Sequence, residues 1–208
     1  MKIAVMSDIH GNIYALMKTL EDIDEQNVDK IICLGDLVGY GPHPNEVVAL
    51  IKRREIPCVK GNYDASVVDG DFTYIRNTAI NSFALPWACE EVRVANKYYL
   101  DSLPTSLKYT FNGVNILLTH GSPNAINDYL FEDDEKTKEI MSQYEGDVLV
   151  CAHTHIPFAK KYNNKLLINV GSVGKPKIGK PNPTYALIEI NDNGEVKVTF
   201  KYLEYEYK

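Results

Sequence analysis

Thiolate chemistry has little support in this sequence. The 208-residue chain contains four cysteines, and no two of them have the C-x-x-C spacing of zinc-binding and redox motifs. Most lie in apolar segments rich in β-branched residues, so we expect small buried side chains and reduced thiols at Cys33, Cys58, Cys89 and Cys151. This usage argues against a thiolate zinc site or an iron–sulfur cluster.

Long apolar runs and an excess of positive charge are also absent. The first apolar stretch, residues 3–6, is far too short for a signal peptide, and nothing resembles a membrane-spanning segment. We therefore expect a cytoplasmic protein without a membrane partner. The net charge of −6 disfavours a nucleic-acid polymer as partner. Lysines do gather late in the chain, mostly as a solvated face, at Lys160, Lys161, Lys165, Lys175, Lys177 and Lys180.

Polar residues recur instead where apolar, β-rich segments end. Side chains at i and i+2 of an extended chain point to the same side, so Asp8 with His10, and His153 with His155, can each present two ligands in one direction. The pairs Gly35-Asp36, Gly61-Asn62 and Thr119-His120 lie between them. Together these positions supply seven candidate metal ligands: Asp8, His10, Asp36, Asn62, His120, His153 and His155.

Seven ligands are too many for one tetrahedral ion. They suit two divalent ions that share a bridging carboxylate at a separation of roughly 3.5–4 Å. Carboxylate, amide oxygen and imidazole suit manganese, which we expect, with iron, nickel, zinc or cobalt as alternatives. Only the two aspartates are anionic, so two divalent ions leave a positive centre that attracts phosphate oxygens.

The ordered motifs resemble those of the calcineurin-like metallophosphoesterase superfamily, in particular its small bacterial and archaeal phosphodiesterases and phosphatases. The resemblance covers nearly the whole chain. It rests on Asp8-x-His10, Gly35-Asp36, Gly61-Asn62-x-Asp64, His120-Gly121 and His153-x-His155, with Gly39-Tyr40-Gly41-Pro42 and Asn169-Val170-Gly171-Ser172 also typical. It implies an α/β fold in which two packed mixed sheets are flanked by helices, in four α/β/β/α layers.

The resemblance also implies a role for each ligand. Asp8, His10 and His155 would bind one ion, and Asn62, His120 and His153 the other. Asp36 would bridge the two ions together with a hydroxide, which would be the nucleophile. The predicted function is therefore a binuclear metal-dependent phosphoesterase.

Two further positions are candidate catalytic residues beside Asn62. Many relatives have a histidine after the Gly-Asn pair that helps protonate the leaving group, whereas this chain has Tyr63. A phenol with a pKa near 10 is a weak acid for work near pH 7, so we expect Tyr63 to orient phosphate and aryl leaving groups to be favoured. His43, between two prolines, is a candidate substitute acid, although a solvated turn residue is the stronger interpretation.

We expect one domain over residues 1–208, with a helical insert at about residues 65–103. Residues 2–7, 30–34 and 57–60 have the pattern of parallel strands, alternating with helices at residues 13–24 and 45–54, the second capped by Asn45. Residues 65–69 and 77–101 are expected to be helical, with a break at Pro86. Arg76 and Asn77 in this insert are candidate substrate contacts, although surface roles are the stronger interpretation.

The second half of the chain has the pattern of hairpins. Residues 107–111 and 114–119 flank an Asn-Gly turn, and a strand at residues 148–152 precedes His153. Residues 158–162 with 165–169, and 185–190 with 195–202, are expected to complete a second sheet. Residues 202–207 are expected to be an edge strand and terminus.

The expected substrate is a small phosphorylated molecule, with nucleotides among the candidates. Asp36 lacks the continuation typical of protein phosphatases, so that activity is disfavoured. The loop at residues 171–183 also departs from relatives, at Lys175, Ile178 and Lys180, which predicts a different substrate preference. The alternatives are a non-catalytic metal-binding scaffold of the same fold, and a nuclease. A homo-oligomer is left open.

Overall fold

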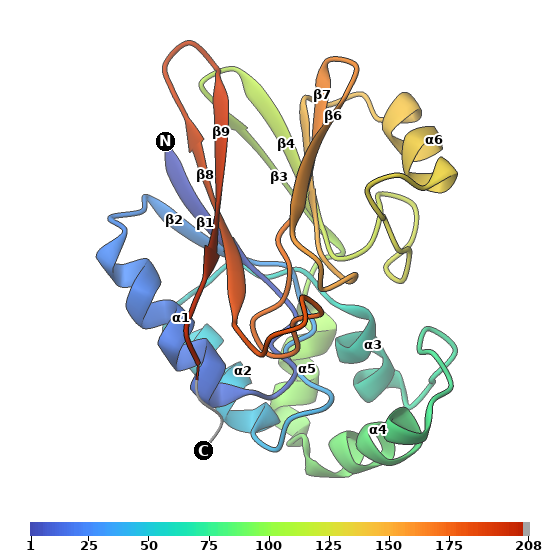
Figure 1. Cartoon of the computed structure of the whole chain (residues 1–208). Coiled ribbons are helices and arrows are strands. Elements are labelled where there is room, and N and C mark those ends of the chain that lie inside the picture. The colour runs from blue at the N-terminus through green and yellow to red at the C-terminus, as the bar shows by residue number, and fades with distance from the viewer. Residues whose placement is uncertain (206–208) are drawn as a thin grey trace.

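The computed structural model of the chain describes residues 1–205. Its first half alternates strands and helices and then becomes wholly helical (Figure 1). The elements are β1 (Lys2–Met6), α1 (Ile13–Glu25), β2 (Lys30–Cys33), α2 (Pro44–Arg53), α3 (Asn62–Asp69), α4 (Ala79–Glu91) and α5 (Val94–Ser102).

The second half consists mainly of antiparallel hairpins with one helix between them. Its elements are β3 (Ser106–Phe111), β4 (Val114–Thr119), α6 (Glu135–Gln143), β5 (Val148–Cys151), β6 (Phe158–Tyr162), β7 (Lys165–Asn169), β8 (Thr184–Ile190) and β9 (Val196–Tyr202).

These strands form two mixed sheets. The first has the order β2-β1-β8-β9, with β1 parallel to β2 and antiparallel to β8. The second has the order β3-β4-β5-β7-β6, with β4, β5 and β7 parallel to one another. Parallel neighbours end at the same edge of a sheet, so the loops after β1 and β2 emerge together, as do those after β4 and β5.

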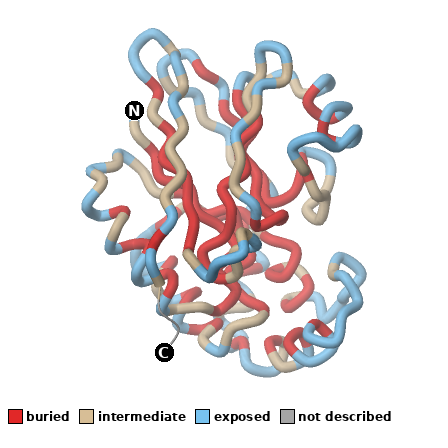
Figure 2. Tube along the Cα trace, viewed as in Figure 1, coloured by how far each residue is buried: buried red, intermediate tan, exposed pale blue. Residues whose placement is uncertain are grey.

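Alternation along the strands divides the interior into layers. In β1, Ile3 and Val5 lie in the core between the two sheets, whereas Ala4 and Met6 lie in the core under the helices. In β5, Val150 belongs to the core between the sheets and Leu149 to the core under α6. Figures 1 and 2 show the buried segments at the centre, with α1 to α5 and α6 outside the sheets. The expected four-layer α/β/β/α arrangement is confirmed.

One sheet assignment from the sequence was wrong. The hairpin of β8 and β9 does not belong to the second sheet, because β8 pairs with β1 in the first, with Ala4 opposite Leu187. Both faces of β8 are buried: Tyr185 and Leu187 pack under the helices, and Ile188 packs between the sheets. A strand from the end of the chain therefore fixes the strand that carries the first motif.

The expected helix break at Pro86 was also wrong. Helix α4 continues through Pro86 and ends at Glu91. The break comes there because the buried Asn45 side chain binds the junction between α4 and α5. Its Nδ2 donates to the Glu91 carbonyl at 2.9 Å, and its Oδ1 accepts from the Arg93 amide at 2.9 Å and from Asn96 Nδ2 at 2.9 Å. Asn45 thus stabilises the insert, while His43 occupies the N-cap position of α2.

Smaller differences lie around residues 57–69 and in α6. Residues 57–60 form only an isolated bridge between Cys33 and Cys58, not a strand. Helix α3 begins at Asn62, earlier than expected, because Asp64 Oδ2 accepts a hydrogen bond from the Gly61 amide at 3.0 Å and so caps the first turn. Helix α6 was not predicted, since Ile140 and Met141 are its only apolar residues and two adjacent positions show no period.

The ends of the described region complete the comparison with the sequence. Strand β9 ends at Tyr202, so the expected edge strand does not continue over residues 203–205, and residues 206–207 lie outside the described residues. Within residues 1–205, no helix combines the length and the apolar character that crossing a bilayer requires.

Candidate metal centre

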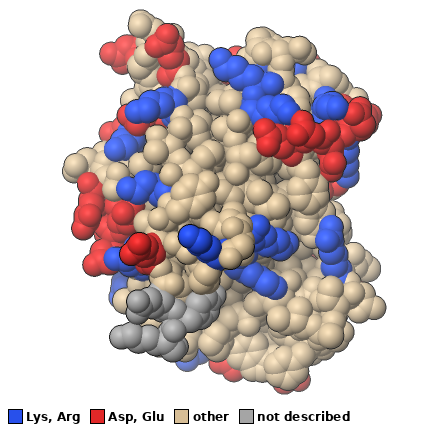
Figure 3. Space-filling view, in the orientation of Figure 1, with Lys and Arg blue, Asp and Glu red and all other residues tan. Residues whose placement is uncertain are grey.

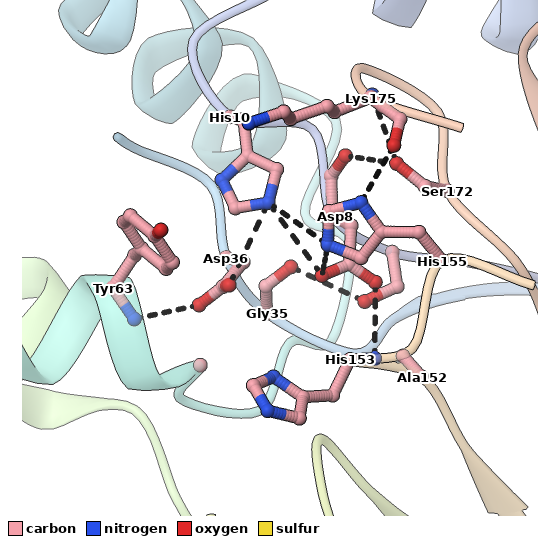
Figure 4. Close-up of polar contacts among 12 residues, drawn as sticks. Asp8, His10, Gly35, Asp36, Tyr63, Ala152, His153, His155, Ser172 and Lys175 are labelled. Atoms are coloured by element: carbon pink, nitrogen blue, oxygen red, sulfur yellow. Dashed lines mark hydrogen bonds and ion pairs between the residues drawn. The ribbon is translucent and has the colours of Figure 1, made fainter. Parts of the chain in front are cut away.

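All seven predicted ligands meet at one place. Asp8 and His10 lie in the loop after β1, and Asp36 lies in the loop after β2. Asn62 is the first residue of α3, and the three later histidines follow β4 and β5. Each of the seven residues is buried, with at most 5% of its surface exposed. Figure 4 shows Asp8, His10, Asp36, His153 and His155 converging from different loops.

The backbone at these ligands is not extended. Asp8, His10, Asp36, His153 and His155 all have a positive φ, between 50° and 65°. The expectation that i and i+2 residues of an extended chain would point together was therefore wrong in its geometry, because both pairs lie beyond their strands in left-handed turns. Aspartate and histidine tolerate this region better than most residues do, although it still costs about 1–3 kcal/mol per residue.

One group of ligand atoms comes from Asp8, His10 and His155. His155 Nε2 lies 3.2 Å from Asp8 Oδ1, and His10 Nε2 lies 3.7 Å from the same oxygen. The two imidazoles approach each other to 3.3 Å between their Nε2 atoms. These three residues offer ligand atoms within 4.8 Å of one another.

A second group comes from Asp36, His120 and His153, with Asn62 beside them. His120 Nε2 lies 3.4 Å from Asp36 Oδ2, 3.2 Å from His153 Nδ1 and 2.9 Å from Asn62 Oδ1. Asp36 Oδ2 is also 3.7 Å from His10 Nε2 in the first group. Asp36 is thus placed between the two groups, where a bridging carboxylate would lie.

These residues fit divalent ions by a physical criterion. Among the described residues 1–205, Asp8 Oδ1 and Asp36 Oδ2 are buried oxygens without a hydrogen-bond partner, and His153 Nε2 is a third buried polar atom without one. Leaving such groups unpaired in the interior costs about 1–3 kcal/mol each. Both unpaired oxygens face imidazole nitrogens, a donor set that manganese, iron, nickel, cobalt and zinc accept. A cation at each group would remove the cost.

The charges in the centre depend on one another. Burial would raise the pKa of Asp8, but the charges of His155, His120 and His10 overcome it and hold that pKa below its ordinary value. Burial likewise opposes, but does not prevent, the lowering of the pKa of Asp36 by His120. Against the effect of burial, Asp36 and Asp8 raise the pKa of His120 to about 10. Metal binding at His120 would therefore release a proton.

At two other histidines the effect of burial on the pKa exceeds that of the carboxylates. It lowers the pKa of His10 to about 4 and that of His153 to about 3. Both imidazoles are therefore neutral near pH 7, which is the form that binds metals.

Backbone carbonyls orient three of the imidazoles. The Nδ1 atoms of His10, His120 and His155 lie 3.2, 2.7 and 2.6 Å from the carbonyl oxygens of Val38, Leu34 and Lys175, respectively. A proton on each Nδ1 would donate to these carbonyls and leave Nε2 free to face the centre. Such contacts fix the tautomer and the ring direction of metal-binding histidines.

Asp64 ties two of the ligand loops together. Its Oδ1 accepts from the amides of Leu37 and Val38 at 2.9 and 3.3 Å, and its Oδ2 accepts from Gly61. Asp64 is fully buried beside Asp36, and both effects raise its pKa to about 7. The loops also touch directly, because a Cβ atom on Gly61 would lie 2.1 Å from Asp36 Oδ1. Only glycine allows this approach.

Tyr63 lies beside the centre with its hydroxyl group turned toward other residues. Its amide donates to Asp36 Oδ1 at 2.8 Å, and its ring stands edge-on to His10 at 4.9 Å between ring centroids. The hydroxyl donates to Asn81 Oδ1 at 2.9 Å and contacts the Tyr40 hydroxyl. Burial, followed by the Tyr40 contact, raises the pKa of Tyr63 above its ordinary value. Sequence reasoning had not connected Asn81 with this position.

His43 has a different environment. It lies at the N-cap position of α2, and its ring stands edge-on to Tyr14 at 5.4 Å. Among residues 1–205, no hydrogen bond or ion pair joins its side chain to a ligand of the centre. This placement favours the interpretation as a turn residue.

Sequence reasoning missed Tyr129, whose ring packs against His153 with 4.0 Å between centroids. The guanidinium carbon of Arg76, a candidate substrate contact, lies over the Tyr129 ring at 4.2 Å from its centroid. Nothing in the spacing around Tyr129 marks it, because only the fold brings residues 76, 129 and 153 together.

Known proteins share both the sequence pattern and the fold. The sequence model of the calcineurin-like phosphoesterase superfamily domain matches residues 1–193. The uncharacterized protein MJ0912 of Methanocaldococcus jannaschii is 34% identical, over 99% of this chain and 88% of its own length. Phosphodiesterase YfcE of Escherichia coli is 27% identical, over 92% of this chain and 94% of its own length. The crystal structure of a metallophosphoesterase from Sphaerobacter thermophilus aligns with a TM-score of 0.81 at 28% identity, over 99% of this chain and 89% of that one.

Proposed function

Because the chain belongs to the calcineurin-like phosphoesterase superfamily, we propose that it hydrolyses phosphodiester or phosphomonoester bonds of a small phosphorylated molecule at a centre of two divalent ions. Metal-dependent phosphoester hydrolysis follows from the family. The number of ions, the role of each residue and the kind of substrate are the parts that we propose.

One observation carries the proposal. Two groups of three buried ligands lie side by side, and one carboxylate oxygen in each, Asp8 Oδ1 and Asp36 Oδ2, has no hydrogen-bond partner in the described part of the chain. A single ion would leave one group of ligands unused. Two ions satisfy both oxygens and make the centre positive, which favours phosphate.

The assignment of ligands follows the two groups. Asp8, His10 and His155 would hold one ion, Asn62, His120 and His153 would hold the other, and Asp36, which lies between the two groups, would be shared by them. When bound, the two ions supply a hydroxide nucleophile near neutral pH and neutralise charge on the phosphoryl oxygens. We propose manganese as the native metal on the basis of the donor set.

The remaining groups of the chain position these ligands. The carbonyls of Val38, Leu34 and Lys175 direct three imidazoles toward the centre. The Tyr63 amide holds Asp36 Oδ1 and thereby leaves Oδ2 for the ions. The Tyr63 ring forms part of the wall beside His10, where it would orient the bound phosphate. We assign Tyr63 this orienting role rather than that of a proton donor.

The alternatives have less support. A non-catalytic scaffold would not need an orienting partner behind each of three histidines, and a relative over most of both chains is a phosphodiesterase. A nuclease would need a long basic groove, whereas the chain carries a net charge of −6.

A hydrolysis assay tests the proposal. Metal-stripped protein is resupplied with manganese, and turnover of bis-nitrophenyl phosphate is compared with that of nitrophenyl phosphate. We expect metal-dependent turnover, two bound ions per chain by elemental analysis, and loss of turnover by at least about 100-fold in Asp36→Asn. The ratio of diester to monoester turnover then directs the search for the substrate.

Two results would contradict the proposal. Absence of turnover with manganese, nickel, iron and zinc, despite two bound ions, would favour a non-catalytic metal-binding scaffold over a phosphoesterase. One bound ion with full activity would refute the two-ion centre. Asp101→Asn, which changes an exposed aspartate outside the centre, serves as a matched control and should keep full turnover.

A further inference from the structure

Arg76 stands close to the candidate metal centre but does not belong to it. Its exposed guanidinium lies over the ring of Tyr129, and that ring packs on His153. The cation is therefore separated from a metal ligand by one aromatic ring. A guanidinium held against an aromatic face keeps its N–H groups free in the plane for an anion.

The backbone that carries Arg76 is fixed to the centre. The Arg76 carbonyl accepts from Asn81 Nδ2 at 2.8 Å, and Asn81 in turn accepts from the Tyr63 hydroxyl. The Tyr74 carbonyl accepts from Nδ2 of the ligand Asn62 at 3.2 Å. Asn62 and Tyr63 thus hold this segment beside the site, and Arg76 is not the tip of an unattached loop.

Two lysines approach the centre from the loop between β7 and β8. The Lys177 amide donates to the His155 carbonyl at 3.2 Å. Lys175 Nζ lies 3.0 Å from the centroid of the Tyr40 ring. Figure 3 shows basic side chains gathered across the middle of this face, over the loop between β7 and β8 in Figure 1, with no acidic side chain visible between them.

Within residues 1–205, none of these three cations has a counter-ion. Elsewhere in the described residues, Lys60, Lys136 and Lys160 each form an ion pair with an aspartate. Over residues 1–205, Arg76, Lys175 and Lys177 form no ion pair. In a chain with a net charge of −6, unpaired cations around a buried centre are a local exception.

Arg76 and Lys177 reach the centre from opposite halves of the sequence. The Tyr129 ring lies between Arg76 and His153, and the Lys177 amide is bonded to the carbonyl of His155, two residues further along. An anion bound by both cations would gain two attractive interactions.

We propose that Arg76, held on Tyr129, and Lys177 bind a second phosphate group of the substrate while the phosphate to be cleaved lies at the metal centre. This inference rests on the proposed function, because the position of the cleaved phosphate comes from it. The substrate class is a small molecule with two separate phosphate groups, such as a nucleoside bisphosphate. Arginine matches phosphate with two parallel hydrogen bonds, so we expect Arg76 to contribute more than Lys177 to binding the second phosphate.

Competition with a substrate that has a single phosphate tests this site directly. Initial turnover of bis-nitrophenyl phosphate by the manganese-loaded protein is inhibited with adenosine 3′,5′-bisphosphate and with adenosine 5′-monophosphate, which differ by one phosphate, and the two inhibition constants give the affinities even where a ligand is itself hydrolysed. We expect the bisphosphate to bind about 10 to 100-fold more tightly, as charge-assisted hydrogen bonds provide. Arg76→Gln should abolish that preference and leave the affinity for the monophosphate within about threefold.

Three variants separate the site from general charge effects. Arg93→Gln removes the same charge from an exposed position of the same insert and should keep the preference. Tyr129→Phe keeps the aromatic face and should also keep the preference for the bisphosphate. Tyr129→Ala should reduce that preference by about 10-fold. Equal affinities of the wild-type protein for both ligands, retention of the preference in Arg76→Gln, or an equal loss in Arg93→Gln would each overturn the inference.

Turnover of bis-nitrophenyl phosphate, which has a single phosphate, distinguishes failure of this inference from failure of the proposed function. Wild-type turnover without a bisphosphate preference would refute only the second phosphate site. Absence of wild-type turnover would refute the proposed function, and with it the assignment of the metal centre to the cleaved phosphate.

Discussion

The nature of the leaving group should control the rate of this enzyme through Tyr63. The Tyr63 side chain is buried, with 6% exposed, and its hydroxyl proton is donated to Asn81. Burial and the neighbouring Tyr40 hydroxyl raise its pKa above the ordinary value of a phenol. The residue beside His10 therefore holds its proton tightly and directs it away from the centre.

The size of the effect follows from acid catalysis. A positioned acid with a pKa near the working pH contributes about 10²- to 10⁴-fold, and an acid with a pKa above 10 forfeits most of this. Aryl leaving groups depart as stable anions and do not need the proton, whereas alkyl leaving groups do. We expect Tyr63→Phe to change turnover of bis-nitrophenyl phosphate by less than about threefold.

Tyr63→His introduces an acid of suitable pKa at the same position. We expect it to raise turnover of dialkyl and monoalkyl phosphates by at least about 10-fold while turnover of nitrophenyl esters stays nearly constant. The assay is a series of esters with graded leaving groups, measured for wild type and both variants with saturating manganese. The rate should depend less steeply on the leaving group in Tyr63→His.

Either of two results would refute this reasoning. If Tyr63→Phe slowed aryl and alkyl esters equally by more than about 10-fold, the hydroxyl would be required in a step that does not depend on the leaving group. If Tyr63→His left the dependence unchanged, the side chain at this position would not reach the leaving oxygen. Metal content and far-ultraviolet circular dichroism of each variant show that the centre is intact.

Three further predictions concern the loops around the centre. Asn45→Ala removes three hydrogen bonds at the junction of α4 and α5 and should lower the free energy of unfolding in urea by about 2–4 kcal/mol, whereas Asn96→Ala, which removes one of them, should cost about 1 kcal/mol. Gly61→Ala places a Cβ atom 2.2 Å from the Asp36 amide nitrogen, so we expect a loss of about 1–3 kcal/mol in stability and about 10 to 100-fold in metal affinity, measured by denaturation and metal titration; unchanged affinity would contradict the close approach of these loops. His43→Ala should leave the pH dependence of nitrophenyl phosphate turnover unchanged, and a lost ionisation in that profile would instead identify His43 as an acid.

The sequence predicts that the candidate ligands lie close together, because each follows the end of an apolar segment. The alternation of Ile3 and Val5 with Ala4 and Met6 marks β1 as buried on both faces, and Asp8 comes just after it. Parallel pairing then brings the Asp8 and Asp36 loops to one edge. These steps depend on local pattern and chain order, which the sequence contains.

The features that the sequence did not predict depend on contacts between distant residues. Helix α4 tolerates Pro86 because Leu85 and Ala88 pack in the core, and it ends where Asn45 binds the chain 46 residues further along. The pairing of β8 with β1 joins the two ends of the sequence. The contact between Arg76 and Tyr129 likewise joins the helical insert to the loop before α6. Hydrophobic periodicity does not report on any of these long-range contacts.

Backbone hydrogen bonds make the ligand loops an extension of the sheets. The Asp8 amide donates to the Gly35 carbonyl at 3.0 Å, and the His10 amide donates to the Asp36 carbonyl at 2.9 Å, so pairing between the first two loops continues past the ends of β1 and β2. The Ala152 amide donates to the His120 carbonyl at 2.9 Å in the same way. Ligand side chains add to these bonds, since Asp36 Oδ1 accepts from the Tyr63 amide at 2.8 Å and Asp8 Oδ2 accepts from the His153 amide at 3.2 Å. Asp36→Asn keeps the Oδ1 acceptor, so it should leave the loops in place, and its loss of activity reports on the chemistry of the centre rather than on folding.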